Sequence, residues 1–171
     1  MLFTGIMLTK SGPEVLEYNA RFGDPETQAL LPLLKSNLAE IVKAYVERKL
    51  QEVEVEMHNK SCAVAVIAAG GYPRKYPRGD EIKMHHRHSH IGTTPAELKN
   101  PVSIAYKKTD PARQLNLFHA GTTLREDGKL VTSGGRVIAV SSTADSLENA
   151  VKLVYQGVTT VKFDAMFLDV I

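Results

Sequence analysis

An alternation of polar and apolar side chains near the amino end constrains the fold more than any other feature of the sequence. The stretch LEYNARF, residues 16–22, places Glu17, Asn19 and Arg21 at every second position. In a β-strand, side chains two residues apart project from the same face, about 7 Å from one another. We therefore expect these three polar groups to share one strand face, and the apolar residues between them to anchor the other face against a core.

The sequence around this alternation predicts a hairpin followed by a helix. Two β-rich runs within residues 1–22 are separated by KSGP, whose glycine and proline suit a turn. Asp24 is expected to cap the following helix with Pro25 at its first position, because the fixed φ of proline suits a helix start. Pro32 is expected to end or kink this helix near the residue before it.

A second helix and a charged connector are expected next. Residues 38–50 carry an apolar stripe at helical spacing, and Asn37 with Glu40 resembles a capping box in front of them. Glutamates then alternate with valines and a methionine over residues 52–57, which indicates a connector or an edge strand with a solvated face. We place a subdomain boundary near residue 60.

Beyond this boundary the sequence predicts a β-rich unit with one helix. The apolar run 62–73 indicates a buried strand that ends at two glycines and a proline. Residues 74–114 lack sustained periodicity, so we expect an irregular inserted loop. The remaining elements are expected in this order: a strand in 115–124, a hairpin signal at Asp127-Gly128, a strand pair in 130–142, a helix in 145–158 capped by Ser146 or Asp145, and a last strand in 161–171. The predicted fold class is α+β.

Composition excludes several classes of protein. With 21 Lys and Arg against 19 Asp and Glu, the net charge of +2 creates no strong field for nucleic acid or an anionic membrane. No stretch approaches the roughly 20 apolar residues that cross a bilayer, and no signal pattern opens the chain. A single cysteine, Cys62, excludes an internal disulfide and fits a reducing compartment. We therefore expect a cytosolic protein with neither a nucleic-acid nor a membrane partner.

Two groups of polar residues are candidates for a functional site. Glu17 and Asn19 would offer the carboxylate and amide oxygens that a hard divalent ion such as Mg²⁺ prefers, and the planar fork of Arg21 could hold a carboxylate or a phosphoryl charge. A solvent-facing amphipathic strand would show the same pattern by chance. Gly135 and Arg136 in SGGRV could bring backbone and charge to a phosphate, or could form a turn or bulge with a surface arginine.

Histidines provide two weaker candidates. The tract MHHRHSH contains His85, His86, His88 and His90, and neutral imidazole is a common transition-metal ligand. It has no nearby cysteine or acidic pair, so we favour a solvated tract. His119 in LFHAGT is expected to be a packed, hydrogen-bonded histidine rather than a base.

LEYNARFGDPETQ resembles the signature of phosphoribosylamine–glycine ligase, also called glycinamide ribonucleotide synthetase, an ATP-grasp family of the purine pathway. VIAAGGYP, FHAGT, GKLVTSGGRVIAVS and AVKLVYQGV resemble the family's C-terminal domain in the same order. The resemblance covers most of residues 3–73 and 115–163. It implies that residues 1–60 form the last part of an ATP-grasp domain with the metal-binding strand, and that residues 61–171 form the C-terminal domain with an irregular insertion at 74–114.

The resemblance also implies a chemistry. In the family, ATP phosphorylates the carboxylate of glycine, and the amine of 5-phosphoribosylamine attacks the acyl phosphate to give glycinamide ribonucleotide, ADP and phosphate. Glu17 and Asn19 would then be ligands of Mg²⁺ or Mn²⁺, Arg21 a catalytic contact, and Gly135 with Arg136 a substrate contact. The family's glycine-rich phosphate loop and adenine-binding strands do not occur here. We therefore expect a fragment with little or no ligase activity alone.

Departures from the family leave other interpretations open. The ending FDAMFLDVI differs from the family pattern, and no part of the aminoimidazole ribonucleotide synthetase to which many eukaryotic members are fused is recognisable. A carboxylating ATP-grasp enzyme such as biotin carboxylase shares Glu-x-Asn-x-Arg, although the continuation RFGDPETQ fits the glycine ligase better. A binding or assembly module without catalysis is the non-enzymatic alternative.

Overall fold

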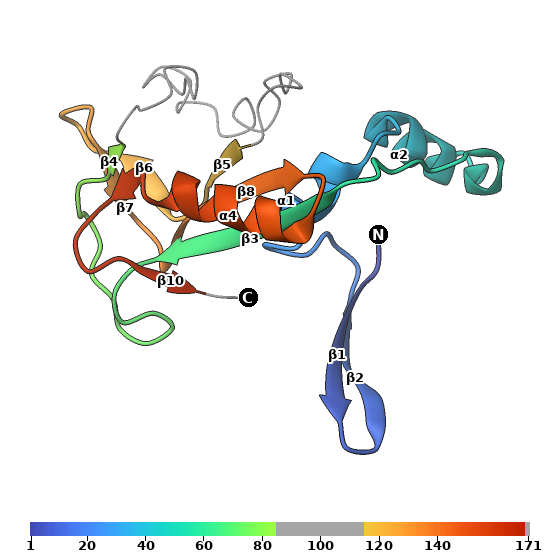
Figure 1. Ribbon diagram of the computed structural model, residues 1–171, viewed down its shortest axis with the longest axis horizontal. Helices are drawn as coiled ribbons and strands as arrows, with labels where there is room; N and C mark the ends of the chain where they lie inside the picture. Colours follow the sequence, from blue (N-terminus) through green and yellow to red (C-terminus); the bar gives the residue numbers. More distant parts are fainter. Residues whose placement is uncertain (85–114, 170–171) are drawn as a thin grey trace.

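The computed structural model describes residues 1–84 and 115–169, and its mixture of helices and sheets confirms the predicted α+β class (Figure 1). Its centre is an antiparallel sheet of four strands in the order β10-β3-β8-β5. These strands are β3 (Ser61–Ala68), β5 (Leu115–His119), β8 (Arg136–Ala144) and β10 (Phe167–Asp169). β3 and β8 pair along most of their length, which places the run predicted to be a buried strand at the middle of the sheet.

Helix α4 (Leu147–Val158) covers this sheet and completes the main core (Figure 1). It begins at Ser146, whose hydroxyl accepts a hydrogen bond from the backbone N–H of Asn149, so the serine rather than Asp145 is the cap. A Cβ atom added to Gly157 would lie 2.8 Å from Cγ1 of Val140. The helix backbone therefore approaches β8 more closely than a larger residue would allow.

A hairpin of β6 (Thr122–Leu124) and β7 (Leu130–Thr132) follows β5, and its turn carries Gly128 at φ +80° as the Asp-Gly signal predicted. The prediction that residues 130–142 form a strand pair is wrong, because β7 pairs with β6 whereas β8 pairs with β3 and β5. The chain changes partner at the glycines between β7 and β8. There Ser133 N–H and Gly134 N–H both donate to the carbonyl of Gly121.

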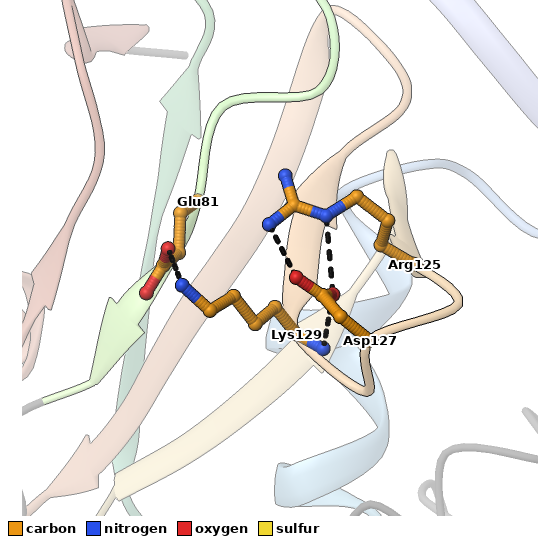
Figure 2. A network of polar contacts seen from close by, with 4 residues as sticks. All are labelled: Glu81, Arg125, Asp127 and Lys129. Carbon is orange, nitrogen blue, oxygen red and sulfur yellow. Dashed lines mark hydrogen bonds and ion pairs between the residues drawn. The ribbon is translucent and has the colours of Figure 1, made fainter.

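Polar contacts hold the segment before β4 (Lys83–Met84) onto the β6–β7 hairpin (Figure 2). Lys129 Nζ donates to Glu81 over 2.7 Å and joins the two segments. Within the hairpin turn itself, Arg125 donates to both carboxylate oxygens of Asp127. β4 itself pairs with β9 (Val161–Lys162). The prediction of an irregular loop from residue 74 is therefore wrong for residues 79–84, because their backbone forms hydrogen bonds with residues 130 and 132. No periodicity within residues 79–84 could predict these distant bonds. The four histidines of MHHRHSH lie outside the described residues.

The predicted last strand is also divided. β9 ends at Lys162, and β10 begins only at Phe167. Between them Ala165 takes φ +51°, a left-handed conformation that turns the chain from β4 towards β3. One continuous strand over 161–171 is thus incorrect.

The amino end forms the predicted hairpin, β1 (Phe3–Thr9) with β2 (Gly12–Asn19), and this hairpin projects away from the central sheet (Figure 1). Leu16 is 63% exposed and Tyr18 is 65% exposed. The expectation that the apolar residues of this strand pack against a core is therefore wrong within the part of the chain that the structure describes. Among the described residues, the strand pairs with β1 and no apolar layer lies beneath it.

The segment after the hairpin begins its helix later than predicted. α1 (Thr27–Leu30) starts from Glu26 without a side-chain cap, so the prediction of an Asp24 cap is wrong. Asp24 instead accepts hydrogen bonds from Arg136. The prediction for Pro32 is confirmed, since the α-helix ends at Leu30 and the proline lies in the 3₁₀ turn η1 (Leu31–Leu33).

Helix α2 (Leu38–Val46) is capped as predicted by Asn37, whose side-chain oxygen accepts from the N–H of Ala39 over 2.9 Å. The helix ends four residues before the predicted residue 50, because Arg48 adopts φ +59°. Its apolar stripe is largely exposed, with Tyr45 66% exposed. None of the helices described here has the length and apolar character that crossing a membrane requires.

The glutamate-rich stretch is a connector rather than an edge strand. A short 3₁₀ turn, η2 (Leu50–Glu52), leads into an extended segment whose Met57 makes an isolated bridge with Leu34. Glu56 is exposed and forms an ion pair with Lys35 at 2.6 Å, which lowers the pKa of the carboxyl group chiefly through their hydrogen bond. The glutamate side chains are thus solvated, as expected, but on an irregular backbone.

Candidate active site

Glu17 and Asn19 lie side by side at the end of β2. The side-chain Nδ2 of Asn19 donates to Oε1 of Glu17 over 2.9 Å, which confirms that these two side chains share a face. The pairing with β1 shifts register between Gly5 and Ile6, so that Leu16 has no partner and the regular alternation resumes at Glu17. The bulge therefore precedes the two polar residues and leaves them aligned.

The oxygens of this pair fit a hard divalent ion. Oε2 of Glu17 and Oδ1 of Asn19 are not used by the hydrogen bond that joins the two residues. The side chain of Glu17 is exposed, and Asn19 is half-buried at the end of β2. Within residues 1–84 and 115–169, no three His, Cys, Asp or Glu side chains form a group that could hold a metal. A cation at this pair would thus complete its shell with water or with oxygens of a bound molecule, which is the usual manner of Mg²⁺ in phosphate-binding sites.

Arg21 lies beyond the strand rather than on its face, because β2 ends at Asn19. One of its terminal N–H groups donates to the carbonyl of Phe22 over 2.9 Å, and its guanidinium carbon lies 5.5 Å from the centre of the Phe3 ring. The predicted three-residue strand face therefore consists of two residues, with the arginine on the turn that follows. Most of its donors remain available, since a guanidinium carries five N–H groups.

The turn after Arg21 is compact and is held to the central sheet. A Cβ atom at Gly23 would lie 2.6 Å from Oε2 of Glu26 and 3.1 Å from the Phe3 ring. The next residue, Asp24, accepts from Arg136 twice: the backbone carbonyl takes one guanidinium nitrogen at 2.8 Å and the carboxylate takes the other at 2.9 Å. Sequence reasoning did not find this pair, because no spacing rule relates residues 112 positions apart.

Close packing around Gly135 leaves no room for a side chain. A side chain at Gly135 would overlap the ring of Tyr72, which itself stands edge-on to Tyr76 with ring centres 6.1 Å apart. The carbonyl of Gly135 accepts from the N–H of Ala69 over 2.8 Å. Arg136 is the first residue of β8 and lies next to a register shift, which agrees with the bulge that the sequence left open as an alternative. The substrate contact expected of Gly135 and Arg136 stays a prediction.

His119 is the packed histidine that the sequence led us to expect. Its Nδ1 lies 3.2 Å from the hydroxyl of Thr122, and its Nε2 is buried without a hydrogen-bond partner in the described structure. Burial lowers the pKa of the imidazole. His119 lies on β5 opposite Ile138, a core residue.

Two family profiles match this chain. The profile described as "Phosphoribosylglycinamide synthetase, C domain" matches residues 62–168, and "Phosphoribosylglycinamide synthetase, ATP-grasp (A) domain" matches residues 1–27. The first covers more than half of the chain. The second includes Glu17, Asn19 and Arg21.

Relatives with names and a solved structure agree with these profiles. The chain is 51% identical over 168 residues to the bifunctional purine biosynthetic protein of Schizosaccharomyces pombe, which covers 98% of this chain and 18% of the relative. It is 40% identical over 169 residues to the phosphoribosylamine–glycine ligase of Synechocystis, covering 98% and 35%. The crystal structure of phosphoribosylamine–glycine ligase from Thermotoga maritima superposes with a TM-score of 0.64 at 29% identity, covering 98% and 35%. The chain thus spans between 18% and 35% of the length of these relatives.

Proposed function

The chain belongs to the phosphoribosylglycinamide synthetase family, and from this premise we propose that it serves as part of a phosphoribosylamine–glycine ligase of purine biosynthesis. The proposed reaction transfers the γ-phosphoryl group of ATP to the carboxylate of glycine. The amine of 5-phosphoribosylamine then attacks the acyl carbon, phosphate leaves, and glycinamide ribonucleotide forms. The observation that carries the proposal is the oxygen pair Glu17–Asn19 within the residues matched by the ATP-grasp profile.

In this proposal Glu17 and Asn19 hold the Mg²⁺ or Mn²⁺ that accompanies ATP. When bound, such an ion would neutralise charge on the phosphates of ATP. The two side chains contribute through their placement: a 2.9 Å hydrogen bond keeps the carboxylate and the amide together before any ligand arrives. Because the amide of Asn19 presents its N–H group to the carboxylate, it would rotate when its oxygen and the carboxylate bind one cation.

Arg21 is proposed to orient the carboxylate of glycine or the transferred phosphoryl group. Its stacking on Phe3 and its bond to the Phe22 carbonyl fix the base of the guanidinium. The remaining N–H groups can form the paired hydrogen bonds that planar oxyanions accept. Gly135 and Arg136 remain proposed as substrate contacts. The guanidinium of Arg136 uses two of its five N–H donors on Asp24, which leaves three for a bound molecule.

Three further proposals concern the context of the site. We keep the division into residues 1–60, the last part of an ATP-grasp domain, and residues 61–171, the C-terminal domain. We also keep the cytosolic location and a fusion to another purine enzyme such as aminoimidazole ribonucleotide synthetase. The existence of relatives named bifunctional or trifunctional purine biosynthetic proteins supports the idea of fusion. The family profiles favour the glycine ligase over a carboxylating ATP-grasp enzyme.

A chimaera tests the proposed function directly. Residues 1–171 would replace the matching 168-residue stretch of the Schizosaccharomyces pombe relative, which is 51% identical. The purified chimaera should release ADP from MgATP only when both glycine and 5-phosphoribosylamine are present. Residues 1–171 alone should release little or none, because the family's adenine-binding strands are not among them.

Two results would contradict the proposal. The chimaera could fold but show no glycine-dependent ADP release while the unmodified relative is active under the same conditions. Alternatively, ADP release could depend on bicarbonate instead of glycine, which would indicate the carboxylating class. A thermal melt of the chimaera, compared with that of the relative, separates loss of function from failure to fold.

A further inference from the structure

We propose that Arg136 is a positioning residue, which acts through Asp24 to fix the turn that carries Arg21 against the central sheet. The inference deepens the proposed function, on which its catalytic part rests. It assigns a role to Asp24, which the sequence suggested only as a helix cap. It also gives the guanidinium of Arg136 a partner within the protein.

The contact between Arg136 and Asp24 is bidentate and spans a large sequence separation. One guanidinium nitrogen reaches the backbone carbonyl of Asp24 at 2.8 Å, and the other reaches its carboxylate at 2.9 Å. Because the guanidinium is planar and rigid, two bonds to one residue fix both its distance and its orientation. A lysine has a point charge on a flexible stem and cannot reproduce this geometry.

The turn has few other side-chain links to the sheet. Among the side-chain hydrogen bonds of the described ranges, those that join residues 21–26 to the four-stranded sheet come from Arg136. The others of this turn are local, such as Arg21 to Phe22 and Gln28 to Asp24. On the other side of the turn lies the exposed β1–β2 hairpin, which offers no core (Figure 1).

Arg136 is itself well fixed. Its carbonyl accepts from the N–H of Gly121 over 2.8 Å, and Gly135 before it is confined beneath the ring of Tyr72. Its side chain is 35% exposed, whereas that of Asp24 is 59% exposed. The guanidinium therefore projects from a hydrogen-bonded strand start and binds the more exposed of the two residues.

This arrangement has a consequence for the proposed chemistry. Arg21 lies three residues before Asp24 and rests on Phe3, the partner of Asn19 in the hairpin, so drift of the turn would move Arg21 and the Glu17–Asn19 pair together relative to the central sheet. A displacement of about 1 Å at a reacting group can reduce a rate by about 100-fold. We call the two hydrogen bonds between Arg136 and Asp24 the clamp. Loss of the clamp should reduce kcat more than it raises the KM for ATP or glycine.

The first experiment measures the turn itself and needs no enzymatic activity. Hydrogen–deuterium exchange of residues 1–171 is followed by mass spectrometry in the unmodified chain, Arg136→Gln and Asp24→Ala. Peptides covering residues 21–27 should exchange at least about fivefold faster in both variants, and the double variant should show no further increase, because one contact is lost in each case. Peptides from β3 and β8 should be unchanged, which shows that the sheet remains folded.

Arg125→Gln is the matched control. Arg125 also donates twice to an aspartate, at 3.1 and 2.7 Å, but its partner Asp127 lies in the same turn (Figure 2). This variant removes a similar ion pair without touching the link between turn and sheet. Exchange over residues 21–27 should therefore stay as in the unmodified chain.

The second experiment places the same variants in the chimaera with the Schizosaccharomyces pombe relative. Asp24→Ala, which leaves Arg136 in place, should lower kcat for glycine-dependent ADP release at least about tenfold with each KM within about threefold. Arg136→Gln should lower kcat at least as much, and Arg136→Lys should recover little. Unchanged exchange over residues 21–27 in Arg136→Gln would overturn the clamp. Faster exchange with an unchanged kcat would overturn its role in positioning. If the unmodified chimaera is inactive, the ligase function fails instead, and the exchange data alone decide whether the clamp exists.

Discussion

The side-chain amide of Asn19 donates to the carboxylate of Glu17 across 2.9 Å, on a strand whose side chains are almost all exposed. The two residues are therefore arranged by β2 and its partner β1, without the help of a core. A change at either position should consequently alter the chemistry of the site while leaving the fold unaffected.

We expect Glu17→Gln to lower glycine-dependent ADP release by the chimaera at least about 100-fold, because the substitution removes the negative charge that holds the cation. The melting temperature should stay the same, since Glu17 is exposed. Glu14→Gln is the control: Glu14 is another exposed glutamate of β2, and its carboxylate accepts hydrogen bonds from Thr9 and Ser11 at the hairpin turn. Equal activity of the two variants would refute the role of Glu17 as a metal ligand.

Gly135→Ala should destabilise the chain by about 1–3 kcal/mol, because the added methyl group overlaps the Tyr72 ring and forces it aside. Urea denaturation of residues 1–171, followed by circular dichroism, measures the loss. A second substitution, Tyr72→Ala, removes the obstructing ring. Gly135→Ala should then cost much less in the Tyr72→Ala background than in the unmodified chain, and equal costs would show that the ring is not the cause.

Ile138→Ala should lower the free energy of unfolding by about 2–5 kcal/mol, the range for deleting a large aliphatic side chain from a core. Ile138 is 1% exposed at the centre of β8. Leu8→Ala is the control, because Leu8 is 83% exposed on the hairpin and its loss should change the stability by less than about 0.5 kcal/mol. Comparable losses for the two variants in urea denaturation would mean that the hairpin is packed in solution.

Acidification should destabilise the chain in part through His119. Burial lowers the pKa of this imidazole below the ordinary histidine value of about 6.5. The unfolded chain then binds a proton more readily than the folded chain, so stability is fully present above about pH 6.5 and falls as the pH drops below it. The urea midpoint measured at about pH 7.5 and about pH 5.5 should therefore fall less in His119→Gln than in the unmodified chain.

His58→Gln serves as the control for this titration, because His58 is exposed on the connector before β3. Its midpoint should show the same fall with pH as the unmodified chain. If His119→Gln and the unmodified chain lost stability equally, the imidazole would not contribute to the pH dependence.

Local chemistry in the sequence was sufficient to predict several elements. The caps at Asn37 and Ser146, the Asp-Gly turn and the apolar run of β3 each depend on residues within a few positions of one another. The alternation that brings Glu17 beside Asn19 is of the same kind. Such signals survive in the structure because no distant contact competes with them.

The failures share a different cause, which is competition from distant partners. Asp24 is of a residue type that commonly caps helices, yet its carboxylate accepts a hydrogen bond from Arg136, which is 112 residues away. Residues 79–84 lacked periodicity, yet Glu81 pairs with Lys129 and the backbone bonds to residues 130 and 132. The strand pair expected over 130–142 is divided because two glycines let the chain exchange one partner strand for another. None of these contacts can be read from a single segment.

The bulge at Leu16 has one more effect on the hairpin. By accommodating an extra residue before Glu17, it places Tyr18 opposite Thr4 and leaves Val15 opposite Ile6, so these two apolar side chains of β2 lie on one face of the hairpin. Glu17 and Asn19 lie opposite Gly5 and Phe3 on the other face. A β2 strand without the bulge would put Val15 and Glu17 on the same face, and the separation of an apolar side from the proposed ligand-binding side would be lost.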